Sequence, residues 1–218
     1  MENKWIIIFT FLAIIILILS YFNIYRYIRI HYDSDDKYIK KYKKIKKHQM
    51  DCRIIISLTT IPERIKHIKP VLKSLLDQTI KVDQIVLNIP KICKGDTYDI
   101  PEELNKMCNI FTCGRDYGPG TKFIPTILRE NNADTIIIML DDDYIYGENF
   151  IKTLLEEYKK DPLNALCLNE GMLIKPEFID PKILYTNKKY INNEWIKKYI
   201  LPKIKNIKYN NNLRSFLI

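Results

Sequence analysis

Three consecutive carboxylates, Asp141, Asp142 and Asp143, directly follow an apolar run that begins after Thr135. The run is rich in β-branched residues and lacks polar alternation, which predicts a strand buried on both faces of a parallel sheet. Crowded carboxylates repel one another unless a cation or solvent compensates their charge. Hard divalent ions such as Mg²⁺ and Mn²⁺ use oxygen ligands and leave positions for water and phosphates. The triplet therefore predicts a metal site, with a solvated acidic turn as the alternative.

A second stretch with possible chemistry is the segment 118–122, which reads Gly-Pro-Gly-Thr-Lys. It ends where residues 123–129 can begin a helix. Backbone N–H groups at such a turn can bind an anion, and Lys122 would add positive charge. The spacing does not match a P-loop. We therefore expect an anion site of another kind here, with an ordinary turn as the alternative.

The elements that would position these residues alternate between strands and helices. Strands are predicted at residues 53–59, 83–90, 110–113, 135–140 and 165–168, and helices at 65–78, from 101, at 123–129 and at 147–161. This alternation predicts an α/β fold with a parallel or mostly parallel sheet. Ligands bind outside the carboxyl ends of such strands, where the triplet lies. The tail from residue 182 has a poor pattern, and we expect it to be partly helical near residues 194–200.

The N-terminal region predicts a membrane anchor. Residues 5–25 contain no charged side chain and are almost wholly apolar. About 20 such residues in a helix cross the hydrocarbon core of a bilayer. A cleaved signal peptide is the competing interpretation, but small residues at a cleavage site are missing. We expect a single-pass membrane protein; the flanking basic residues favour a cytoplasmic C-terminal part, although the side stays open.

Charge divides the 218 residues into parts. The net charge is +9, of which residues 1–50 contribute +6, so the remainder is nearly balanced and argues against nucleic-acid binding. We expect a flank at residues 1–4, the anchor at 5–25, a basic stem at 26–50 and a folded domain at 51–218, starting near Cys52. The lysine-rich stem lies on anionic headgroups or forms a solvated linker. The five cysteines lack metal-type pairing and are expected to be free thiols.

The order of these features resembles a glycosyltransferase of the GT-A fold, broadly of the family 2 kind. The matching pieces are the strand and loop at residues 54–64, the helix end at 74–79, the strand at 85–88, the loop at 115–122 and the D-x-D element at 136–143. The resemblance covers roughly residues 52–170. It implies a Rossmann-like, mostly parallel sheet flanked by helices, as in nucleotide-diphospho-sugar transferases.

The resemblance also implies roles for particular residues. The donor nucleotide sugar would be bound by Thr59, Thr60, Arg64, Asp116, Lys122 and Asp142. Lys122 would lie near the diphosphate, and Asp141 and Asp143 would hold Mn²⁺ or Mg²⁺ through the donor's phosphates. The activity implied is that of a hexosyltransferase, whose acceptor is a glycan, a lipid or a protein.

The chain departs from the family beyond the triplet. An inverting enzyme needs a carboxylate base for the acceptor hydroxyl, usually placed well after the D-x-D strand. We expect a C-terminal part that is short for the family, because 218 residues leave about 75 after Asp143. The three histidines all precede the triplet. We expect Glu170 to be this base. Glu177 and Asp180 are the other nearby acids.

Two alternatives compete with an active glycosyltransferase. Phosphatases of the haloacid dehalogenase type also place D-x-D at a strand end, but near the start of the domain and followed by Thr or Val, whereas Tyr144 follows here. The other alternative is a catalytically inactive GT-A relative that binds a nucleotide sugar or a partner without turnover.

Overall fold

The computed structural model describes residues 2–21, 23–130, 132–168, 171–179 and 207–209, and its described strands form one seven-stranded sheet in the order β3-β2-β1-β4-β6-β5-β7. The strands are β1 (Ile54–Thr59), β2 (Gln84–Pro90), β3 (Asn109–Cys113), β4 (Ile136–Leu140), β5 (Ala165–Leu168), β6 (Gly171–Ile174) and β7 (Ile207–Tyr209). Only β6 runs antiparallel to its neighbours. The structure therefore confirms the predicted α/β class with a mostly parallel sheet.

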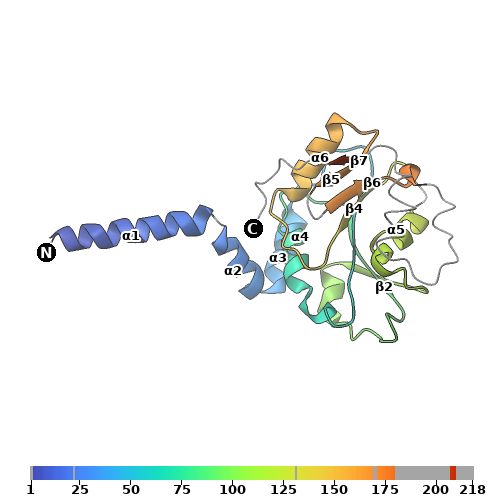
Figure 1. The fold of residues 1–218 in the computed structure, drawn as a ribbon, viewed down its shortest axis with the longest axis horizontal. Coiled ribbons are helices and arrows are strands. Elements are labelled where there is room, and N and C mark those ends of the chain that lie inside the picture. Colours follow the sequence, from blue (N-terminus) through green and yellow to red (C-terminus); the bar gives the residue numbers. More distant parts are fainter. Residues whose placement is uncertain (1, 22, 131, 169–170, 180–206, 210–218) are drawn as a thin grey trace.

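Helices cover both faces of this sheet (Figure 1). The described α-helices are α1 (Glu2–Tyr21), α2 (Ile24–Tyr32), α3 (Asp35–Lys44), α4 (Lys69–Leu76), α5 (Ile124–Arg129) and α6 (Phe150–Lys160), of which α4 and α6 cover one face and α5 covers the other. The central strands β1 and β4 lie in register, with Ile56 opposite Ile138. Alternate residues of β4 enter two separate clusters, Ile136 and Ile138 with α4 and α6, and Ile137 with α5. A strand covered on both faces needs apolar residues at every position, as this run has.

Some predicted boundaries were wrong. Residues 65–67 form a separate 3₁₀ turn, and α4 begins only at Lys69 with Pro70 in its first turn. Proline lacks the N–H that an inner helical position needs, so it favours a helix start. The helix expected from residue 147 begins at Phe150, and the one expected from 101 is a 3₁₀ turn, Glu102–Lys106.

Sequence reasoning missed β6, which is short and opens on Gly171, a residue that weakens a strand pattern. Gly171 pairs with Leu140, the last residue of β4. A Cβ atom at Gly171 would come within 2.8 Å of Phe150 and 2.9 Å of Leu140, so glycine permits this close pairing. Glu170, Asp180 and the helix expected at 194–200 lie outside the described residues.

The segment expected to be a stem packs onto the domain instead. Ile30 of α2 and Tyr38 of α3 belong to the main core cluster, and Arg26 is buried with its Nε 2.8 Å from Asp77 Oδ2. The packed part therefore extends upstream of Cys52, where the sequence placed its start. The reason is that the buried residues of α2 and α3 are few and stand among basic side chains, which obscure the helical pattern.

Helix α1 extends away from this body (Figure 1). No single helix among the described residues is long and apolar enough to cross a membrane. Lys4–Ser20 and Ile24–Tyr32, bent by 66°, meet that requirement of length and composition only when taken together.

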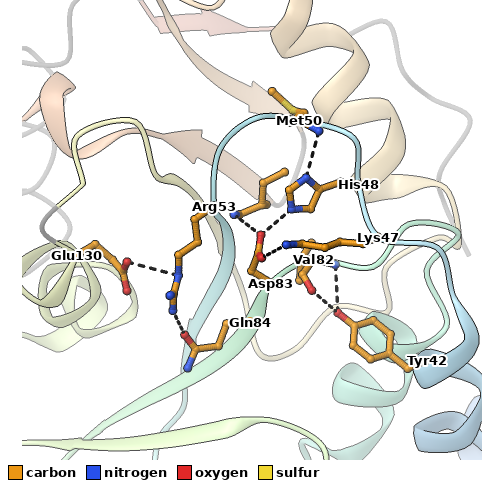
Figure 2. A network of polar contacts seen from close by, with 10 residues as sticks. Tyr42, Lys47, His48, Met50, Arg53, Val82, Asp83, Gln84 and Glu130 are labelled. Carbon is orange, nitrogen blue, oxygen red and sulfur yellow. Dashed lines mark hydrogen bonds and ion pairs between the residues drawn. The ribbon is translucent and has the colours of Figure 1, made fainter.

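A polar network around Asp83 ties the segment before β1 to the start of β2 (Figure 2). The Asp83 carboxylate accepts hydrogen bonds from His48 Nε2 at 2.6 Å and the Ile54 N–H at 2.9 Å, and Lys47 Nζ lies 2.5 Å away. The Met50 N–H donates to His48 Nδ1, which leaves the Nε2 proton for Asp83. Burial alone would raise the pKa of Asp83, but these donors outweigh burial and lower it to about 2.

We predict that Asp83→Asn destabilises the protein at neutral pH. A carboxyl whose pKa is lowered in the folded state stabilises it above the unfolded value of 3.8, and this contribution disappears as pH falls towards about 2. The loss at pH 7 should be on the order of 2 kcal/mol in urea unfolding. The parent should also lose stability more steeply than the variant between those pH values. Parallel pH profiles would contradict the assignment; the exposed Asp99→Asn serves as control.

Candidate active site

The carboxyl ends of β1, β2 and β4 surround a pocket of about 590 Å³. Its lining includes Thr59, Thr60, Ile61, Arg64, Pro90, Cys93, Lys94, Tyr98, Asp116, Gly118, Pro119, Thr121, Lys122, Asp141, Asp142 and Asp143. All eight residues predicted to bind donor or metal are therefore brought together, from segments up to 84 positions apart in sequence (Thr59 to Asp143). The predicted base, Glu170, lies outside the described residues.

Two cations compensate the three carboxylates after β4. Lys122 Nζ pairs with Asp141 Oδ1, while Arg64 lies 3.1 Å from Asp142 Oδ1 and 2.9 Å from Asp143 Oδ2. The side chain of Asp142 is only 7% exposed, against 39% for Asp141 and 65% for Asp143. Asp141 and Asp143 therefore present accessible carboxylates, whereas Asp142 is enclosed.

The surroundings of Asp142 raise the pKa of its carboxyl. Burial raises the pKa of its carboxyl, and the neighbouring Asp143 raises it further. The hydroxyl of Thr60 donates to Asp142 Oδ2 at 2.5 Å, and Arg64 adds positive charge, but together they do not offset the burial. The acidic turn thus places a carboxyl with a raised pKa at the pocket, and perturbed pKa values are common at functional sites.

Tyr146 fixes the backbone of the acidic turn from behind. Its hydroxyl accepts the Asp141 N–H at 2.8 Å and donates to the Asp141 carbonyl at 3.2 Å. The Tyr146 N–H donates to Ser74 Oγ on α4, at 3.1 Å. Tyr146 is fully buried, so the turn is anchored to the core through an aromatic residue that the sequence analysis did not single out.

A buried polar cluster positions Lys122 from beneath. Asn88 Nδ2 donates to Ser57 Oγ at 3.0 Å and to Thr126 Oγ1 at 2.9 Å, and Ser57 donates to the Lys122 carbonyl. Arg129 donates to Asn88 Oδ1 at 2.8 Å. Ser57 and Asn88 were visible as polar residues inside otherwise apolar strands, a signal that the sequence analysis did not use. The cluster explains why Lys122 can face Asp141 across the pocket.

In the glycine-bearing segment, where we expected a backbone anion site, two of the backbone donors are already occupied. It forms a short 3₁₀ turn, Gly118–Lys122. The N–H of Gly118 donates to Asp116 Oδ1 at 2.7 Å, and that of Gly120 to the Tyr117 carbonyl at 3.1 Å. These two N–H groups are therefore not free for an anion, whereas Lys122 adds a positive charge to the pocket lining.

The loop after β2 supplies pocket residues that the sequence analysis missed. Cys93, Lys94 and Tyr98 line the cavity, and the Tyr98 hydroxyl donates to the Thr60 carbonyl at 2.8 Å. Lys94 and Gly95 have positive φ angles of 51° and 106°, where the chain reverses between Cys93 and Asp96. The Lys94-Gly95 pair predicts a turn in this loop, but it does not show that the loop folds over the pocket.

The pocket chemistry fits a hard divalent cation bound together with a phosphate ligand. Within the part of the chain that the structure describes, no group of three His, Cys, Asp or Glu side chains is placed to hold a metal. Asp141 and Asp143 nevertheless offer two accessible carboxylates. Mg²⁺ and similar ions often use one or two protein carboxylates and complete their shell with water and phosphate oxygens.

Comparisons with known proteins give only distant structural likenesses. No protein-family model and no curated protein sequence matches the chain. Similar solved structures include S. aureus TarS, with 15% identity, a TM-score of 0.40 and coverage of 52% of this chain and 34% of TarS. Another is the mannosyltransferase PcManGT from Pyrobaculum calidifontis in complex with GDP-Man and Mn²⁺, with 11% identity, a TM-score of 0.43 and coverage of 75% and 55%. This chain thus spans about a third of the length of TarS and about half of the length of PcManGT.

We predict opposite stability effects at the two ends of one hydrogen bond. Asp142→Asn removes a buried charge whose pKa is raised, so its melting temperature should equal or exceed that of the parent. Thr60→Val keeps the shape but leaves Asp142 without its hydroxyl donor, and should cost about 1–3 kcal/mol. Thermal unfolding of both variants at pH 7 tests the two expectations. A large loss of stability in Asp142→Asn would contradict the raised pKa.

Proposed function

We propose that this protein is a glycosyltransferase that uses a nucleotide-diphosphate sugar bound in the pocket at the carboxyl ends of β1, β2 and β4. The main support for the proposal is that one cavity is lined by Asp141, Asp143, Lys122 and Arg64, together with Thr59, Thr60, Asp116 and Asp142. Binding outside the carboxyl ends of parallel strands is the usual place for nucleotides in α/β folds.

The balance of charge makes donor binding depend on a metal ion. The pocket lining contains four carboxylates, those of Asp116 and the triplet, against the three cations Arg64, Lys94 and Lys122. One negative charge remains, so a diphosphate alone is repelled. Asp141 and Asp143 would hold Mn²⁺ or Mg²⁺, which would supply charge stabilisation for the leaving diphosphate.

Lys122 and Arg64 have a further task in this proposal. Each is now paired with a carboxylate of the triplet, Lys122 with Asp141 and Arg64 with Asp142 and Asp143. With a cation held by Asp141 and Asp143, Lys122 would be free to contact phosphate oxygens, and so would the Arg64 Nη1 that now faces Asp143. Positioned cations stabilise the negative charge that grows as the glycosidic bond to the nucleotide breaks.

We propose Glu170 as the base that accepts the proton of the acceptor hydroxyl. Gly171, which follows Glu170, pairs with Leu140, which precedes Asp141, so the chain enters β6 beside the triplet. Transfer of a hexose to a glycan, lipid or protein acceptor belongs to the same proposal. So does anchoring of the chain to a membrane by α1, which is apolar and exposed.

We predict that Asp141→Asn and Asp143→Asn each lower metal-dependent release of nucleotide by at least about 100-fold. The full chain in detergent is incubated with a panel of nucleotide sugars, with and without Mn²⁺, and thermal stabilisation and nucleotide release are recorded. Asp134→Asn is the matched control, because Asp134 is an exposed acid outside the pocket lining. A folded parent that responds to no donor would contradict the proposal.

We predict that Glu170→Gln separates chemistry from donor binding. Donor-induced stabilisation in Mn²⁺ should be unchanged, while the rate of sugar transfer to an active acceptor falls by about 10²–10⁴-fold, the usual contribution of a general base. Glu177→Gln is the control, since Glu177 is paired with Lys175 at 3.0 Å. Unchanged transfer by Glu170→Gln would eliminate this base. Donor stabilisation without any release in the parent would instead favour the inactive, nucleotide-sugar-binding alternative.

A further inference from the structure

Helices α2 and α3 carry exposed faces that the proposed reaction does not use. On α2, Tyr25, Ile28 and Tyr32 are exposed at helical spacing, on the side away from the buried Arg26 and Ile30. On the segment from α3 onwards, the lysines Lys40, Lys43, Lys44 and Lys46 are exposed. Among the described residues none of these four lysines forms an ion pair.

Both helices are fixed to the domain by charged contacts in which the Arg26, Lys73 and Asp77 side chains are buried. Asp77 at the end of α4 binds Arg26 of α2, and it also pairs with Lys41 of α3. Lys73 of α4 donates to the Asp33 carbonyl at 2.6 Å and lies 3.1 Å from Asp35. Breaking a buried ion pair is costly, so the two helices move with the domain.

The exposed groups change in character along the chain. Helix α1 is apolar on all sides and exposed from Trp5 to Ile18, α2 presents two tyrosines with an isoleucine, and the next segment presents lysines. The same order, apolar, then aromatic, then basic, matches hydrocarbon, interface and anionic headgroup in a bilayer. The 66° bend between α1 and α2 turns α2 away from the axis of α1.

We propose that the exposed side chains Tyr25, Ile28 and Tyr32 of α2 and Lys40 and Lys44 of α3 dock on the surface of an anionic lipid bilayer. The aromatic residues enter the interface and the lysines bind lipid phosphates. Because α2 and α3 are fixed to α4, docking sets the orientation of the whole domain on the membrane. A flexible stem would leave that orientation free.

The test uses the full chain in lipid nanodiscs without donor or metal, so it is independent of the proposed reaction. Ser34→Cys, in the exposed turn between α2 and α3, carries an environment-sensitive fluorophore; the Ser34 side chain makes no capping hydrogen bond that the substitution would remove. Discs of phosphatidylcholine are compared with discs that also contain phosphatidylglycerol. Labelled parent protein gives the background from the natural free cysteines.

We predict blue-shifted emission, quenched by spin labels at headgroup depth, only in the anionic discs. The double variant Lys40→Gln, Lys44→Gln should weaken docking by about fivefold for each lysine. Its matched control, Lys91→Gln with Lys94→Gln, removes the same charge from the loop after β2 and should have no effect. Equal emission in neutral and anionic discs, or equal effects of the two double variants, would overturn the proposal. So would a signal in detergent that rises with protein concentration, because it indicates a second copy.

Discussion

The mutual repulsion of three carboxylates at the end of β4 is the constraint on which this structure depends. Asp141, Asp142 and Asp143 are tolerated because Arg64 and Lys122 reach them from two other segments. Arg64 follows β1, the parallel neighbour of β4, and Lys122 is held by a polar cluster that spans β1 and β2. The order of the strands therefore brings Arg64 and Lys122 to the three carboxylates. Because their charges are compensated in this way, the acidic turn is tolerated beside a cavity.

The same region is rigid for a physical reason. Tyr146 clamps the backbone of Asp141 and is itself bonded to Ser74 of α4, while Asp77 of the same helix holds α2. Helix α4 thus contacts both the acidic turn and the N-terminal helices. A domain built in this way can present its pocket at a fixed orientation to whatever surface α2 and α3 contact.

Much of the fold could be predicted from the sequence because buried strands have an unambiguous pattern. The runs that became β1, β2 and β4 are mostly apolar and rich in β-branched residues, and the residues after each one had to meet at a shared sheet edge. That rule was sufficient to predict that Thr60, Arg64 and the triplet lie close together. It was insufficient for β6, which is short and opens on a glycine, and for α2 and α3, whose buried Ile30 and Tyr38 stand among basic residues. The side chains behind the site, Tyr146 and Asn88, depend on tertiary contacts that no local pattern encodes.

In the proposed reaction, a diphosphate enters this pocket only together with a divalent cation. Calorimetric titration of the full chain with a panel of nucleoside diphosphates, with and without Mn²⁺, tests it most directly. We predict that the nucleotide that binds does so at least about tenfold more tightly with Mn²⁺, a difference near 1.4 kcal/mol, and that Asp143→Asn removes the difference. Equal affinity with and without the metal, or a metal effect that survives in Asp143→Asn, would contradict the account.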